Sequence, residues 1–144
     1  MIRTATAVDA EAIAAVHVRA WRHAYADLLD PHVLADLDVA ERARKWREWL
    51  GGEDSQTWVA EVAGRVAGFA SVRDGMLRAL YVDPVAQGAG VGSALLEQAE
   101  AAGARELEVF AGNGHGRRFY EARGWRDDGD AGEWLERSLR RYVR

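Results

Sequence analysis

The stretch that decides the fold is Met76–Ala102, MLRALYVDPVAQGAGVGSALLEQAEAA. It begins with an apolar run of β-forming residues, Met76–Val82, which Asp83-Pro84 closes because proline cannot continue a sheet ladder. The glycine-rich segment QGAGVG (residues 87–92) follows. Beyond it, apolar residues recur at the spacing of one helix face, at Val91, Ala94, Leu95 and Ala99. The stretch therefore predicts a strand, a glycine-rich loop and a helix, in that order.

A glycine-rich loop that leads into a helix can bind an anion. The first N–H groups of a helix have no intrahelical partner, they lie at the positive end of its dipole, and glycine has no Cβ to hold a phosphate away. The spacing excludes two well-known phosphate loops. The Gly-Lys-Ser/Thr ending is missing, since the only lysine is Lys45, and the glycines are spaced G-x-G-x-G rather than G-x-G-x-x-G. A mobile surface loop without a ligand is the other interpretation.

Length and composition limit the function further. At 144 residues, 49% of them hydrophobic and 29% charged, the chain is expected to form a single domain over residues 1–144. The absence of cysteine excludes disulfides, thiolate metal sites and a cysteine nucleophile. A net charge of −4 argues against nucleic acid as the main partner. No membrane span, secretory signal or histidine metal motif is found, so we expect a cytoplasmic protein without a metal.

The remaining periodicities predict a mixed, mostly antiparallel α/β (α+β) sheet of about seven strands with about four helices. Strands are expected at Ile2–Thr6, Thr57–Ala63, Val66–Arg73, Met76–Val82, Glu106–Ala111, Trp125 and Trp134–Leu139. Helices are expected from the Asp9 cap to Ala24, then at Val39–Leu50, Val91–Ala102 and Asn113–Arg123, with a short helical segment at Pro31–Leu37. Turns are expected at Gly64-Arg65, Asp74-Gly75 and Asp127–Asp130. Gly114 and Gly116 each cost about 1 kcal/mol of helix propensity, so the last helix is expected to begin late.

Two motifs resemble the GCN5-related N-acetyltransferase (GNAT) family. Gln87, Gly90 and Gly92 occupy the fixed positions of its Gln/Arg-x-x-Gly-x-Gly/Ala signature, and LYVDP (residues 80–84) resembles its fourth strand and exit. NGHGRRFYEARGW (residues 113–125) resembles its N-x-x-A-x-x-F/L-Y-E-x-x-G-F/W stretch, with Gly116 in place of alanine, and ERSL (residues 136–139) resembles its last strand. The resemblance covers Ile2–Leu139 and implies the acyl-CoA N-acyltransferase fold, with acetyl-CoA as cosubstrate and an amine as acceptor.

The resemblance also implies where acetyl-CoA binds. In the family the fourth and fifth strands splay apart and leave main-chain groups free for the thioester and pantetheine. The implied cofactor residues are Leu80, Tyr81, Val82, Gln87, Gly88, Ala89, Gly90, Val91, Gly92, Asn113 and Tyr120. Asn113 has an alternative role in a plain Gly-Asn-Gly turn. Arg117 and Arg118 are expected either to contact phosphates or to form a solvated helix face.

Acetyl transfer from a thioester to an amine needs an oxyanion site, a proton donor for the leaving thiolate and an acceptor for the amine proton. Main-chain N–H groups near Leu80–Val82 are expected at the oxyanion. Tyr120 is the candidate donor, because the family places a tyrosine near the sulfur and a phenol with a pKa near 10 is protonated at neutral pH. The alternative for Tyr120 is aromatic packing against the sheet.

The candidate base is Glu108. Many relatives carry a glutamate where this chain has Gly75-Met76, whereas Leu107-Glu108-Val109 resembles the ribosomal-protein N-terminal acetyltransferases, in which a glutamate at this place is the base. A solvent-facing strand residue is the alternative, with a water chain or the more distant Glu61 taking the proton. By resemblance, Trp21, Arg22 and Tyr25 wall the acceptor site, with a core role as the alternative for Trp21. The four histidines have no metal-binding spacing and are interpreted as structural or surface residues, of which His23 or His115 is expected to face substrate.

Together these features predict direct transfer of an acetyl group from acetyl-CoA to a primary amine in a ternary complex. Two alternatives stay open, an acyl-CoA-binding sensor or scaffold without turnover and a transferase of a longer acyl group. The acceptor is open among a small amine, an aminoacyl conjugate and a peptide N-terminus. The resemblance allows a homodimer.

Overall fold

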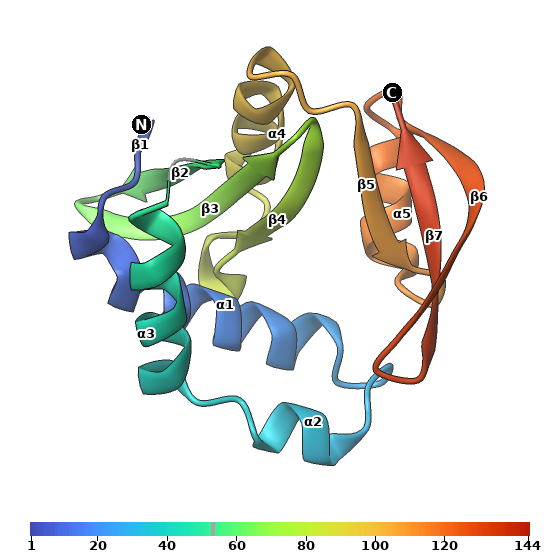
Figure 1. Ribbon diagram of the computed structural model, residues 1–144, viewed down its shortest axis with the longest axis horizontal. Helices are drawn as coiled ribbons and strands as arrows, with labels where there is room; N and C mark the ends of the chain where they lie inside the picture. Colours follow the sequence, from blue (N-terminus) through green and yellow to red (C-terminus); the bar gives the residue numbers. More distant parts are fainter. Residues whose placement is uncertain (53) are drawn as a thin grey trace.

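The computed structural model describes residues 1–52 and 54–144 and contains one seven-stranded sheet (Figure 1). The strand order is β1-β2-β3-β4-β5-β7-β6, and neighbouring strands are antiparallel except β4 and β5. The strands are β1 (Ile2–Thr4), β2 (Ser55–Val62), β3 (Arg65–Arg73), β4 (Met76–Val82), β5 (Glu106–Phe110), β6 (Arg126–Trp134) and β7 (Arg137–Val143). The predicted α+β class and sheet are confirmed.

Helices cover both faces of this sheet. They are α1 (Ala10–Ala24), α2 (Pro31–Ala35), α3 (Val39–Leu50), α4 (Val91–Ala101) and α5 (Gly114–Glu121), with short 3₁₀ turns at Ala7–Asp9 (η1) and Pro84–Ala86 (η2). Because side chains alternate along a strand, Phe69 of β3 packs with α1 and α3, whereas Ala70 and Val72 pack with α4 on the opposite face.

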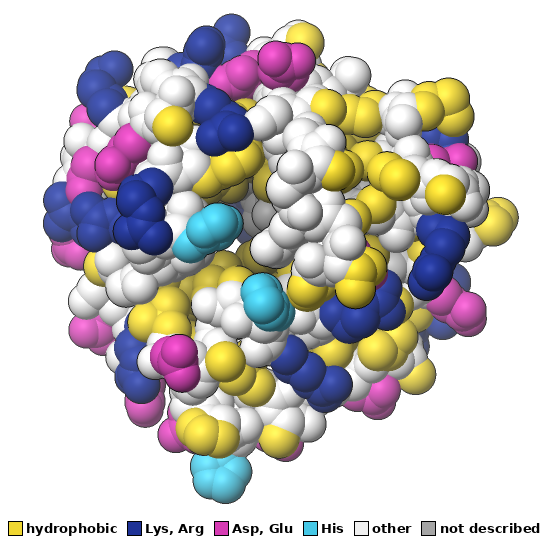
Figure 2. Space-filling model, turned by 180° about the vertical axis from the view of Figure 1, so that it is seen from behind, with side chains coloured by type: hydrophobic (Ala, Val, Ile, Leu, Met, Phe, Trp, Pro, Cys, Tyr) yellow, Lys and Arg dark blue, Asp and Glu magenta, His cyan; other side chains and the backbone are white. Residues whose placement is uncertain are grey.

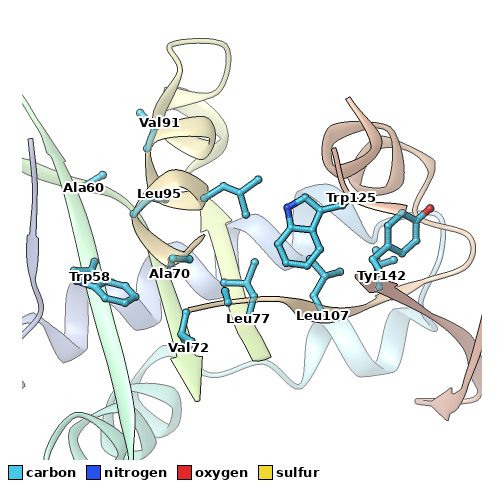
Figure 3. Packing of buried hydrophobic residues seen from close by; sticks show 14 residues of the cluster. Trp58, Ala60, Ala70, Val72, Leu77, Val91, Leu95, Leu107, Trp125 and Tyr142 are labelled. Atoms are coloured by element: carbon cyan, nitrogen blue, oxygen red, sulfur yellow. The ribbon is translucent and has the colours of Figure 1, made fainter. Parts of the chain in front are cut away.

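The cluster on the α4 face joins the two ends of the sheet. Figure 3 shows Val91 and Leu95 of α4 above Ala60 and Ala70, with the same layer continuing to Leu107, Trp125 and Tyr142. The indole N–H of Trp125 donates to Glu100 at 2.9 Å, which ties the segment before β6 to α4. One continuous core therefore connects β1–β4 with β5–β7.

The strands β4 and β5 diverge almost as soon as they pair. Between them, the described residues pair only at Met76–Glu106 and Leu77–Leu107. On the other side of β4, Val72 lies opposite Leu77 and Ser71 lies opposite Ala79, so Arg78 is a surplus residue. A surplus residue of this kind is a β-bulge, which bends the strand and raises its twist. The last pair between the two strands is Leu77–Leu107, and Figure 1 shows β4 and β5 running apart.

The expected turn at Asp127–Asp130 is wrong. These residues lie within β6, where irregularities in pairing occur between Asp127 and Gly129 and between Asp130 and Glu133. The chain instead reverses at Leu135 and Glu136, whose φ angles are +51° and +62°. Trp134 consequently ends β6 rather than opening the last strand, because bulges accommodate the glycine and aspartate residues that favour turns.

Three smaller expectations about the ends of elements are also wrong. The β2–β3 loop is Ala63-Gly64, one residue before the predicted position, and Trp125 precedes its strand. The helix α5 begins at Gly114 rather than late, because the side chain of Asn113 accepts from the N–H of Gly116 at 3.0 Å.

Asp9 does not cap α1 through its side chain. Its carboxylate accepts from the N–H of Thr6 at 2.8 Å and from both terminal nitrogens of the Arg3 guanidinium at 2.9 and 2.8 Å. The pair with Arg3 holds the pKa of Asp9 below its ordinary value. Asp9 therefore fixes β1 to the turn before α1.

Candidate active site

The divergence of β4 and β5 opens a cleft of about 830 Å³. Both strands line it, together with the loop before α4, helix α5, the C-terminal end of α1 and part of β6. Figure 2 shows a hollow on one face of the molecule, with hydrophobic side chains at its floor and histidine side chains beside it. The cleft gathers most of the residues singled out from the sequence: Leu80, Tyr81, Val82, Gln87, Gly88, Gly90, Val91, Gly92, Glu108, Asn113 and Tyr120. Ala89 is exposed and is not among the lining residues.

The loop before α4 has the geometry of an anion cradle. Gly88 and Gly90 have φ angles of +85° and +81°, and a Cβ on either would meet no atom within 4 Å. Within the described chain, none of the N–H groups of residues 88–93 has a backbone acceptor. An open, uncapped helix start with a positive dipole end fits a phosphate or pyrophosphate.

Gly92 lies where the start of α4 approaches α5. Its φ is not in the left-handed region, but a Cβ there would lie 3.4 Å from the ring of Phe119 in α5. Phe119 and the start of α4 are therefore neighbours on the wall of the cleft.

Main-chain groups of β4 face the gap toward β5. The N–H of Asp83 donates to the carbonyl of Ala67 in β3 at 2.7 Å. Because hydrogen bonds alternate along an antiparallel pair, the groups of Leu80 and Val82 then point away from β3 and toward the cleft. The strand thus offers main-chain donors and acceptors where β5 no longer pairs with it.

Tyr120 lies in the second half of α5 and lines the cleft. Its ring packs edge-on against Trp125, with centroids 6.1 Å apart. Burial raises the pKa of Tyr120 above its ordinary value near 10, so the hydroxyl stays protonated at neutral pH and can donate. The packing role and the donor role are compatible in this position.

Glu108 is exposed on β5 and lines the cleft, whereas Glu61 lies elsewhere. Glu61 is in β2, where it accepts from Arg3 at 2.6 Å, and it does not line the cleft. The structure therefore separates the two carboxylates named from the sequence and leaves Glu108 beside the gap.

Aromatic side chains that follow α1 or belong to β5 and β6 line one wall of the cleft. Tyr25 is buried, and its hydroxyl lies 3.5 Å from that of Tyr81. Trp134 is 50% exposed and stacks flat on Phe110, with centroids 5.8 Å apart. Trp21 lies behind them in the core, edge-on to Tyr25, so the core interpretation is correct for Trp21.

The sequence did not indicate the contribution of Trp134, because a misplaced turn assigned it to another strand. Arg22 also lies outside the lining, since it donates to the carbonyls of Leu34 and Leu37 at 3.3 and 2.9 Å.

Two arginines of the second motif, Arg117 and Arg123, have structural partners. Arg117 donates to Tyr142, to the carbonyl of Ala111 and to Asp127 at 2.9, 2.9 and 3.2 Å, and neither Arg117 nor Arg118 lines the cleft. Arg123, which the sequence did not single out, does line it. Its guanidinium donates to the hydroxyl of Ser93 at 3.0 and 2.7 Å and lies 3.9 Å from the ring centroid of Phe119.

The histidines differ in their position relative to the cleft. His115 lines the cleft at the start of α5, whereas His23 is exposed and His17 is buried. Across the described residues, no group of three or more His, Asp or Glu side chains is placed to hold a metal ion. In the same residues, no helix has the length and apolar character needed to cross a membrane.

Comparison with known proteins agrees with this geometry. The model of the acetyltransferase (GNAT) domain matches residues 53–127. The chain is similar to the peptidyl-lysine N-acetyltransferase YiaC of Escherichia coli, with 32% identity over 57% of this chain and 62% of that protein, so the match spans less than two thirds of the relative. It is also similar to the probable N-acetyltransferase Rv2775 of Mycobacterium tuberculosis, with 26% identity over 92% of this chain and 83% of that one.

Solved structures show the same fold over the whole chain. A GCN5-related N-acetyltransferase from Rhodopseudomonas palustris superposes with a TM-score of 0.76 and 28% identity, covering 100% of this chain and 95% of that one. The PaiA N-acetyltransferase of Thermoplasma acidophilum, solved in complex with coenzyme A, gives a TM-score of 0.77 at 18% identity, with 100% and 98% covered. Since the family model matches just over half of the residues and the fold agrees throughout, this chain belongs to the GNAT family of acetyltransferases.

Proposed function

We propose that this protein is an N-acetyltransferase that moves the acetyl group of acetyl-CoA to a primary amine by direct attack in a ternary complex. One observation carries the proposal: the glycine cradle before α4 and the unpaired main chain of β4 line the same cleft. A pyrophosphate held at Gly88–Gly92 would let an attached pantetheine arm run along β4 beside Leu80 and Val82. Coenzyme A bound to the PaiA protein of the same fold supports this choice of ligand.

Bound acetyl-CoA would supply an acetyl thioester, and the residues of the chain would supply the proton chemistry. The attacking amine forms a C–N bond while the C–S bond of the thioester breaks. Main-chain N–H groups near Leu80–Val82 stabilise the negative charge that develops on the carbonyl oxygen. Tyr120 donates its proton to the departing sulfur, and Glu108, directly or through water, accepts the proton that the amine loses.

Ligand binding is tested first by a thermal melt with and without acetyl-CoA. A ligand at a hundred times its Kd adds about 2.7 kcal/mol, or roughly 5–10 °C for a domain of this size. Gly90→Asp puts a carboxylate into the cradle and should abolish the shift. Gly64→Asp is the matched control, because Gly64 has a similar φ of +76° with open space around it but lies in the β2–β3 hairpin. A wild-type protein with no shift at millimolar acetyl-CoA would refute the proposal.

A second candidate is an acyl-CoA-binding sensor without turnover, which is favoured by Met76 at the place where many relatives have a glutamate. Thiol release with a panel of amines separates the two functions. If the protein is an enzyme, Tyr120→Phe should lower turnover about 10²-fold or more, while the thermal shift caused by acetyl-CoA persists. A shift without turnover on any amine would favour the sensor. Replacing acetyl-CoA by longer acyl thioesters tests the remaining alternative of a different acyl group.

A further inference from the structure

Arg78 is the bulged residue of β4, and its charge has no partner in residues 1–52 and 54–144. Its side chain is exposed and lines the cleft, and within the described chain it makes no hydrogen bond or ion pair. The neighbouring pairs place it at the point where β4 leaves β5. A guanidinium on the wall of a cleft is therefore free to bind a ligand there.

Glu108 occupies the corresponding place across the gap. The pairs Met76–Glu106 and Leu77–Leu107 would continue to Arg78 and Glu108 if the strands did not diverge. Glu108 also lines the cleft and also has no hydrogen bond or ion pair among the described residues. The apex of the gap thus carries a cation, Arg78, and an anion, Glu108, that form no hydrogen bond or ion pair with each other or with any other described residue.

The charge nearest to Glu108 on the neighbouring strand β7 is already balanced. Arg141, which lies opposite Glu108 in β7, pairs with Glu106 at 2.5 Å and Asp128 at 3.7 Å. Arg123, another arginine of the lining, is engaged with Ser93 at the opposite end of the cleft, beside the glycine loop. Arg78 and Glu108 therefore remain for a ligand at the apex, and Glu133 of β6, which also lines the cleft, likewise has no hydrogen bond or ion pair among the described residues.

The wall next to the apex is apolar. Phe110 follows Glu108 by two residues and so lies on the same face of β5, and Trp134 stacks on it with half of its surface exposed. Tyr25 packs edge-on against Phe110 from α1, with centroids 5.2 Å apart. An acceptor at the apex would place an apolar side chain on this aromatic wall.

We propose that the acceptor is a free α-amino acid with an apolar side chain, whose carboxylate binds Arg78 and whose amine faces Glu108. This inference rests on the proposed function. A peptide N-terminus has a neutral amide beside its amine, and a lysine side chain has no anion there, so neither would use the Arg78 charge. Arg78 would be a specificity-determining residue, with the acid, rather than the amide or the bare amine, as its ligand.

The experiment compares acetyl transfer to phenylalanine, phenylalaninamide, phenethylamine and the dipeptide Phe-Gly. Because a charge-assisted contact is lost with the carboxylate, wild-type kcat/KM should be about tenfold or more higher for phenylalanine than for the other three. In Arg78→Gln this preference should vanish through a higher KM for phenylalanine, while phenethylamine keeps its rate within about twofold. Arg78→Lys should restore part of the preference. Arg65→Gln makes the same charge change on an exposed residue of β3 outside the cleft and should alter nothing.

Each outcome is informative. Equal rates for acid and amide in the wild type, a preference for Phe-Gly, or an equal loss on all acceptors in Arg78→Gln would overturn the assignment. Failure to acetylate phenylalanine by a protein that still gains thermal stability from acetyl-CoA would also overturn it, leaving the cofactor site intact. Loss of that thermal gain in the wild type would instead refute the proposed function itself. The same melt on Arg78→Gln shows that the variant is folded and binds the cofactor.

Discussion

His17 is a buried ring directly behind the cleft, and it is held neutral. Its Nδ1 accepts from the indole N–H of Trp46 at 3.3 Å, and its ring stacks on Tyr81 with centroids 5.3 Å apart. Burial, with a smaller effect from the charge of Arg42, lowers the pKa of His17 to about 4. The imidazole therefore acts as an aromatic acceptor that orients Trp46 and supports Tyr81.

This environment predicts that acid weakens the fold. The pKa of His17 is lower in the folded state than in the unfolded chain, so the unfolded chain binds more protons between pH 6.5 and about 4. Stability that is complete above pH 6.5 should fall by about 2 kcal/mol between pH 7 and pH 5. Denaturant unfolding across this range measures it.

His17→Asn is the matched variant, because its amide oxygen can replace Nδ1 as acceptor but does not titrate. Its baseline stability should be lower, since the stacked ring is lost, but its slope between pH 7 and pH 5 should be nearly flat. Equal slopes in both proteins would show that another group causes the loss. The pKa of Asp9 is also lowered, so its contribution disappears only at more acid pH.

At the scale of elements, the loop of the β6–β7 hairpin consists of residue types that rarely adopt the left-handed backbone conformation found there. Trp134 pairs with Arg137, so Leu135 and Glu136 form a two-residue loop in which both φ angles are positive. Such loops favour Asn-Gly or Asp-Gly, because residues with a Cβ are strained there. The Asp74-Gly75 loop between β3 and β4 follows the rule, and the β6–β7 loop does not.

We therefore expect Glu136→Gly to stabilise the protein by roughly 0.5–1 kcal/mol. Glu136 is exposed, so little packing is lost, whereas Leu135 packs against a core cluster and is left unchanged. The thermal midpoint should rise by a few degrees. Glu136→Ala removes the same carboxylate but keeps the Cβ and should give no gain. A similar gain in both variants would point to charge rather than backbone strain.

At the scale of the whole molecule, local patterns predicted the order of the elements but not their pairing. Periodicity located the strands from Ser55 to Val82 and the helix α4, because the spacing of apolar residues within each segment is enough to identify it. The bulge at Arg78 left no local signal, since a surplus residue exists only relative to Ser71 and Val72 on the partner strand. The turn expected at Asp127–Asp130 failed for the same reason, because pairing with β7 decides whether these residues form a turn or a bulge.

The candidate site also has a part that local sequence patterns predict and a part that depends on how distant segments pack. The cofactor residues could be named from the two motifs, and all of them except Ala89 line the cleft. The wall built by Tyr25, Phe110 and Trp134 depends on where α1 crosses the sheet and where β6 returns, and neither follows from one segment. Arg117 shows the opposite error: a basic residue in a motif proved to be bound to Tyr142 and Asp127.

The surplus residue Arg78 has a consequence in genetic terms. Removing its single codon in frame would leave each remaining β3–β4 partner in place, with Leu77 opposite Val72 and Ala79 opposite Ser71. In this deletion variant we expect β4 to keep pairing with β5 past Leu77. The variant should still melt cooperatively, but acetyl-CoA should cause no thermal shift. A retained shift would show that the bulge does not hold the strands apart. A duplicated copy of the gene could thus lose its ligand through one three-base deletion and still encode a stable scaffold.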